Sequence, residues 1–281
     1  MPQIFQTWVL SHLCLSITLV PPFDLTSTGI SLRVLPLTHP PLTQVSQTQN
    51  KKRTNLGSPA MEAANPQTYL DELKQELKKK WPKNRSIRIV AHGHSVPTGY
   101  FKGGQVETFK SYPHLLHRQM AAAYPTAVIS VVPTGVGGEN ATRGLQRFRE
   151  DVLALKPDVI IIDYGLNDRA VGLEAARKAW TQMIQMAKSQ GAKVVLLTPS
   201  GDLNADIFDE KDSLSLHAMQ IRAMAAKHNV GLVDSYKLFR TYSKKHNGYK
   251  AIMSQSNHPN LMGHRMIADE LANWFLSGAK D

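Results

Sequence analysis

The chain has 281 residues, and its composition of 42% hydrophobic and 20% charged residues suits a globular protein with a substantial core. Its single cysteine, Cys14, excludes an intramolecular disulfide, so cysteine usage does not fix the redox compartment. The formal net charge of +11 suits an anionic partner. The basic residues are scattered, however, and they form no zinc-finger, RNP-like or basic heptad pattern. A nucleic-acid-binding function would rest on charge alone, and we expect no nucleic-acid partner.

Residues 1–60 differ from the rest of the chain. They are rich in Ser, Thr, Gln and Pro, and the apolar run at 8–20 is too short to cross a bilayer as a helix. No Lys or Arg precedes that run, as a signal peptide would require. Three interpretations stay open: a weak secretion signal, a disordered leader, and an extension upstream of a working start at Met61. The protein is cytoplasmic if the segment is only an extension, and secreted or periplasmic if it is a signal.

From Met61 the chain forms one expected domain, 61–281, which begins with a helix-like stretch and then alternates two patterns. Short apolar runs rich in β-branched residues predict strands at 86–91, 127–132, 158–164, 192–198 and 230–234. The segments between and after them have helical spacing, at about 108–124, 140–155, 172–190, 212–229 and 260–277. This alternation predicts a three-layer α/β/α domain with a five-stranded parallel sheet.

Polar residues follow the predicted strands, where sites in parallel sheets usually lie. Ser95 follows the first strand, and a hydroxyl becomes a nucleophile when a base such as His258 is within hydrogen-bond reach. Gly138 follows the second strand and Asn167 the third. The Gly138 N–H, the Asn167 amide and the Ser95 N–H are donors of the kind that stabilise negative charge on a substrate oxygen.

Four blocks carry these residues: GHS at 93–95, GVGGEN at 135–140, GLND at 165–168 and NHPNLMGH at 257–264. In this order they resemble the Ser, Gly, Asn and His blocks of the SGNH hydrolases of the GDSL esterase/lipase family, over about residues 86–277. The resemblance implies a flavodoxin-like sheet and hydrolysis of small acyl esters, with no metal and no cofactor.

The sequence departs from the family pattern at two positions. The family usually has an aspartate three residues before the histidine, where this chain has Gln255. Three outcomes are open: a Ser–His dyad oriented by Gln255, support of His258 by an acid from the loop 206–212, or a catalytically feeble site. In the first block His94 stands where the family often has aspartate, and it adds a titratable group beside Ser95.

Other interpretations of single motifs are weaker. The GVGGEN block follows a strand and precedes a helix, as a dinucleotide loop does, but Asn140 replaces the third glycine. His92 and His94 could bind a metal with His258, but no carboxylate or cysteine lies nearby in the sequence to complete the site. We expect Asp168 to scaffold the loop of Asn167.

Three further side chains near the blocks have no assigned role. Tyr100 and Phe101 either line the acyl or alcohol pocket or simply pack, and we expect His264 to pack or cap.

The sequence therefore predicts a serine esterase that hydrolyses short acyl esters of a carbohydrate or small lipid through an acyl-enzyme. Acetyl is the acyl group that we expect. An acyltransferase that uses the same residues is a close alternative. A carbohydrate- or anion-binding module with little catalysis is the second, and Gln255 is the feature that favours it.

Overall fold

The computed structural model describes residues 62–277. The expected leader at 1–60 lies outside the described residues, so the division of the chain near residue 60 stays a prediction. Within the described part, none of the helices combines the length and the apolar character that crossing a bilayer requires.

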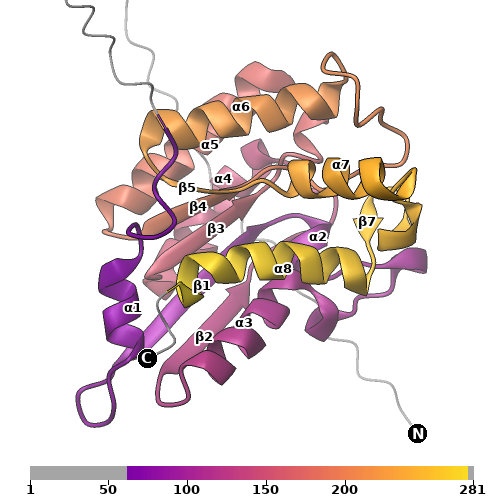
Figure 1. The fold of residues 1–281 in the computed structure, drawn as a ribbon. Helices are drawn as coiled ribbons and strands as arrows, with labels where there is room; N and C mark the ends of the chain where they lie inside the picture. Colours follow the sequence, from indigo (N-terminus) through magenta and orange to yellow (C-terminus); the bar gives the residue numbers. More distant parts are fainter. Residues whose placement is uncertain (1–61, 278–281) are drawn as a thin grey trace, which may run out of the picture. The chain divides into compact units, whose positions relative to one another are not determined.

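A parallel sheet of five strands forms the centre of the domain, in the order β2-β1-β3-β4-β5 (Figure 1). The strands are β1 (Ser86–Gly93), β2 (Val128–Pro133), β3 (Val159–Asp163), β4 (Lys193–Leu197) and β5 (Gly231–Val233). Each coincides with a predicted strand to within a few residues, and the α/β prediction is confirmed.

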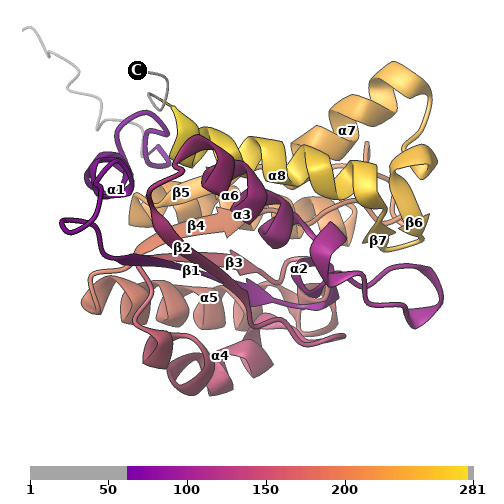
Figure 2. The same cartoon turned by 90° about the horizontal axis from the view of Figure 1, so that it is seen from below.

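Helices cover both faces of this sheet (Figure 2). They are α1 (Asp71–Leu77), α2 (Ser95–Thr98), α3 (Tyr112–Ala123), α4 (Ala141–Asp151), α5 (Gly172–Ser189), α6 (Ser213–His228), α7 (Ser235–His246) and α8 (Leu261–Leu276). One core cluster joins α1, α3, α7 and α8 to the sheet, and a second joins α4, α5 and part of α6 to the opposite face. Because both faces are buried, the strand sequences are apolar at nearly every position; all five residues of β3 are buried.

The structure differs from the sequence-based expectation in three places. The helix-like start at 61–81 contains helix only over α1, because the Asn65 side chain accepts from Gln67 N–H in a turn ahead of it. Helix α7 was not predicted; it follows β5 directly, and Asp234 caps its first turn. The expected loop before the last helix contains a small antiparallel pair, β6 (Met253–Gln255) and β7 (His258–Pro259).

The carboxyl ends of β1 and β3 lie side by side, with Gly93 paired to Asp163. The segment after β2 is tied to the same edge, because Thr134 N–H donates to the Ala91 carbonyl and Val136 N–H to the Gly93 carbonyl. The loops that follow three different strands are thereby held together at one edge of the sheet.

Candidate active site

Ser95 lies at the junction of β1 and α2, as the first residue of the helix. Its Oγ is 2.8 Å from Nε2 of His258, which comes from β7 at the other end of the domain sequence. Both residues are largely buried, with 6% and 8% of their surfaces exposed. The fold therefore places the serine and the histidine that were predicted from the sequence at hydrogen-bonding distance from each other.

The β6–β7 pair and the start of α8 hold His258 in place. The Ser254 hydroxyl donates to the His258 carbonyl at 3.1 Å, and Asn260 caps α8 by accepting from the N–H groups of Met262 and Gly263. Pro259, next to His258, is also buried. The imidazole is thus fixed by backbone structure on both sides.

Gln255 contacts the second ring nitrogen of His258, Nδ1, through its side-chain amide. The same amide donates to Asn257 Oδ1 at 3.2 Å. Three of the four acids of the loop 206–212 have other partners, because Asp206, Asp209 and Asp212 each accept backbone N–H groups within that loop or at the start of α6. Among the described contacts, the partner of His258 Nδ1 is therefore a neutral amide.

The surroundings of His258 keep it neutral over most of the pH range. Burial disfavours the imidazolium and, together with any positive charge on His94, lowers the pKa of His258 from its ordinary 6.5 to about 4. A neutral imidazole has one nitrogen free to accept a proton, which a general base requires.

Gly138 and Asn167 lie in two neighbouring loops that are joined by a hydrogen bond. Gly138 has a φ of 73°, a backbone conformation that glycine adopts without steric cost. The Asn167 side-chain Nδ2 donates one hydrogen to the carbonyl of Glu139 at 3.0 Å. The amide carries two hydrogens, so this bond orients the group and leaves its second N–H available to a substrate oxygen.

A buried polar network underlies the Gly138 turn. Glu139 is 4% exposed. Its two carboxylate oxygens accept from Nε of Arg147, which lies in α4, at 3.0 and 2.9 Å. The Tyr164 hydroxyl donates to the same carboxylate at 3.0 Å and also contacts Nε2 of His92. The backbone that carries Gly138 is thus fixed by a two-point ion pair.

Asp168 plays the scaffolding part expected of it. One carboxylate oxygen accepts from Ala141 N–H at 2.7 Å, and the other accepts from the Trp180 indole at 2.6 Å. Burial raises the pKa of Asp168 to about 6 in spite of these two donors. The residue joins the loop of Asn167 to the start of α4 and does not contact Ser95 or His258.

A second imidazole and a buried carboxylate lie behind Ser95. His94 Nδ1 accepts from Val96 N–H at 3.2 Å and is 3.4 Å from Ser95 Oγ. Since Nδ1 accepts, the ring proton is on Nε2, which is 3.4 Å from Asp163 Oδ1 and makes no hydrogen bond to the described residues. Asp163 also accepts from the Tyr112 hydroxyl at 3.1 Å. The residue that replaces the usual aspartate is therefore matched by a carboxylate on the neighbouring strand.

His92 points away from Ser95 into the network below α4. Its Nδ1 contacts the Thr134 hydroxyl at 2.9 Å and its Nε2 contacts the Gly144 carbonyl at 3.1 Å, so both nitrogens have protein partners. Over residues 62–277 no group of three His, Cys, Asp or Glu side chains is arranged to hold a metal ion.

Sequence analysis missed the side chains that support the site. Arg147, Asp163 and Tyr112 lie in helices or strands, and Tyr164 directly follows β3, in segments whose apolar or charged patterns look structural. The only signals of a role were the place of Glu139 within the glycine block and the places of Asp163 and Tyr164 just before the GLND block. Their contacts join elements far apart in the sequence, and a single sequence gives no such pairing.

The assembled groups can perform acyl transfer. A hydroxyl lies against a ring nitrogen of a neutral imidazole, and the Asn167 amide lies in a neighbouring loop. This is the arrangement of nucleophile, base and oxyanion donors that ester hydrolysis needs.

Comparison with known proteins agrees with this chemistry. An acetylxylan esterase of Geobacillus stearothermophilus is 26% identical over 194 residues, which cover 64% of this chain and 86% of that protein. The crystal structure of an acetyl xylan esterase has a TM-score of 0.58 at 24% identity and covers 66% of this chain and 98% of its own. A two-domain esterase active on acetylated mannans has a TM-score of 0.63 at 16% identity over 79% of this chain and 55% of its own.

The fold of the two solved structures is therefore the fold of this chain. Residues 91–266 match the GDSL-like Lipase/Acylhydrolase family, which is more than half of the chain. The protein belongs to this family and is an ester hydrolase.

Proposed function

We propose that this protein removes acetyl groups from acetylated carbohydrates through a serine acyl-enzyme. The observation that carries the mechanism is the 2.8 Å contact between Ser95 Oγ and His258 Nε2 at the edge of the sheet. The similarity to an acetylxylan esterase, at 26% identity over most of that protein, supports the choice of acetyl group and of a sugar as the alcohol.

In the first half-reaction His258 takes the Ser95 proton while Oγ attacks the acetyl carbonyl carbon. The carbonyl oxygen becomes negative and accepts from the N–H groups of Ser95 and Gly138 and from the Asn167 amide. His258 then gives its proton to the sugar oxygen as the ester C–O bond breaks. Water attacks the acetyl-serine in the second half, His258 takes its proton, and acetate leaves as Oγ regains a hydrogen.

The test is release of acetate from acetylated xylo- and manno-oligosaccharides by the wild type and by Ser95→Ala. We expect turnover by the wild type and a loss of at least about 10³-fold in the variant, since both half-reactions pass through Oγ. p-Nitrophenyl acetate serves as the simple-ester control. Equal rates for wild type and variant on both kinds of substrate would contradict the proposal.

A module that binds acetylated glycans with little turnover is the second candidate. The neutral Gln255 beside His258 Nδ1 favours it, because a carboxylate there would stabilise the imidazolium far more. This function predicts saturable binding of the oligosaccharides with no acetate release by the wild type.

A further inference from the structure

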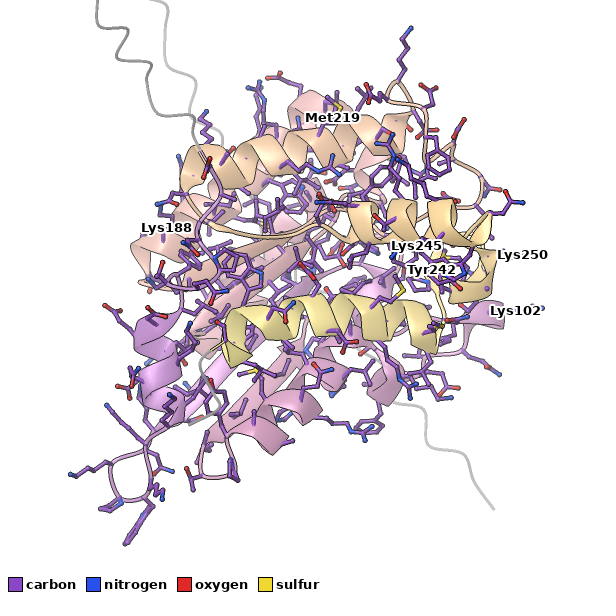
Figure 3. All side chains as sticks on the ribbon, in the orientation of Figure 1. Lys102, Lys188, Met219, Tyr242, Lys245 and Lys250 are labelled. Carbon is purple, nitrogen blue, oxygen red and sulfur yellow. The ribbon has the colours of Figure 1, made fainter. Side chains whose placement is uncertain are left out.

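Tyr100 is fixed to the nucleophile through its backbone. Its N–H donates to the Ser95 carbonyl at 3.0 Å, directly after α2. An antiparallel bridge to Val106 then closes the loop that follows, and Lys102 at its tip extends away from the ribbon (Figure 3). The distance of Tyr100 from Ser95 is therefore set by main-chain bonds, whatever its side chain packs against.

The ring of Tyr100 lies between two parts of the candidate site. It is stacked on the His258 imidazole, with ring centroids 6.1 Å apart and an interplanar angle of 28°. Its hydroxyl end lies over the glycine block, since a β-carbon on Gly137 would be 3.2 Å from both Cζ and the phenol oxygen. Glycine at 137 thus leaves the space that the ring occupies.

The phenol is available to a ligand. Tyr100 is partly exposed, and its hydroxyl has no hydrogen bond to another of the described residues. The neighbouring aromatic residue behaves differently, because Phe101 stacks on the fully buried ring of His264 at 5.3 Å. Both aromatic side chains after the nucleophile are partly exposed, but Phe101 packs against His264 whereas Tyr100 packs against His258 and Gly137.

The chemistry of the leaving group says which part of a substrate meets this ring. A general acid must lie within hydrogen-bond reach of the oxygen that it protonates, so the alcohol part of the ester lies beside His258. A side chain stacked on that imidazole is therefore next to the alcohol. An aromatic face suits the C–H face of a sugar ring, and a phenol hydroxyl suits its hydroxyl groups.

We propose that Tyr100 is the residue that recognises the sugar on the alcohol side of the ester. The inference rests on the proposed function and deepens it, because it assigns the sugar preference to one side chain. It predicts that Tyr100 changes selectivity between alcohols rather than between acyl groups.

The experiment compares an acetylated xylo-oligosaccharide with methyl acetate, whose alcohol has only one carbon. The readout is the ratio of kcat/KM for the two substrates, which is independent of the fraction of active enzyme. We expect this ratio to fall by about tenfold or more in Tyr100→Leu, mainly through KM, and by about threefold in Tyr100→Phe, which keeps the ring. Phe101→Leu is the matched control, and its ratio should equal that of the wild type.

Two outcomes would overturn the inference while the proposed function stands. Equal losses on both substrates in Tyr100→Leu would mean that the ring only positions His258. Faster hydrolysis of methyl butyrate relative to methyl acetate in Tyr100→Leu, with the sugar ratio unchanged, would place the ring on the acyl side. A wild type that cleaves methyl acetate through Ser95 but no acetylated sugar would instead reject the proposed substrate class, and the inference with it.

Discussion

The side-chain amide of Gln255 lies against Nδ1 of His258, while Nε2 of the same ring faces Ser95. The NH₂ group of the amide is the part that faces Nδ1, and this orientation keeps the ring proton on Nε2. Rotation of the amide by half a turn brings its oxygen to Nδ1–H and frees Nε2 to accept from Ser95. The neutral amide therefore permits both tautomers of His258, and only one of them is a base toward Ser95.

Replacement of Gln255 by glutamate keeps the side-chain length and leaves only acceptor oxygens. A carboxylate selects the tautomer with the proton on Nδ1 and stabilises the imidazolium that forms in the reaction. We expect Gln255→Glu to raise kcat for p-nitrophenyl acetate by about tenfold or more. Gln255→Met, of similar length and without a hydrogen-bonding amide, is the control and should be slower than the wild type. A lower kcat in Gln255→Glu, with an unchanged melting temperature, would show that the amide does not limit the rate of the wild type.

The pH profile follows from the burial of His258. The base works only when it is neutral, and its pKa is lowered to about 4, so the acid limb of kcat/KM should lie near pH 4 rather than near 6.5. In Gln255→Glu the added carboxylate favours the imidazolium and should move this limb to higher pH. Circular dichroism at each pH separates titration from acid unfolding. A wild-type limb at pH 6 to 7 would contradict the account of His258.

Removal of the Asn167 amide should lower the rate without abolishing it. One N–H of this side chain is bonded to the Glu139 carbonyl, and the other is free for the substrate oxygen. We expect Asn167→Ala to reduce kcat by about 10²- to 10³-fold with a small change in KM, as for one oxyanion donor. Asn167→Asp keeps the shape but adds a negative charge, so it should be at least as slow. A loss below tenfold in both variants would remove Asn167 from the oxyanion donors.

His94 and Asp163 should be energetically coupled. His94→Asp restores the residue that the family often has, but it sets a second buried carboxylate against Asp163, whose side chain is 5% exposed. We expect this variant to lose at least about 3 kcal/mol of unfolding free energy in urea at pH 8, because it leaves a buried carboxylate uncompensated beside a second one. Adding Asp163→Asn removes the repulsion and should recover most of that loss. Additive losses in the double variant would show that the two side chains do not interact.

The strands and most helices could be predicted because burial on both faces imposes continuous apolar runs, as in β3 (Val159–Asp163). The convergence of the three blocks that follow β1, β2 and β3 could be predicted too, since parallel strands bring their carboxyl ends to one edge. Helix α7 (Ser235–His246) could not, because its polar sequence, with three basic residues in the last turn, resembles a surface loop.

Contacts between side chains that are far apart in the chain could not be predicted from the sequence. The contact of Tyr112 with Asp163 spans 51 residues, and Asp163 reaches His94 from a neighbouring strand. The sequence around each of these three residues does not predict its contact with the other two. The same holds for Tyr100 over Gly137, where a loop after one strand meets the loop after another.

The central claim is that Ser95 is a hydroxyl activated by His258. The most direct measurement is the rate of labelling by a fluorophosphonate probe, with the modified residue identified by peptide mass spectrometry, in the wild type and in His258→Gln. We predict a single adduct on Ser95 in the wild type and labelling at least about 10²-fold slower in His258→Gln, because only an activated hydroxyl attacks the probe quickly. An unmodified Ser95 in the folded wild type, or equal labelling rates in the two proteins, would contradict the account.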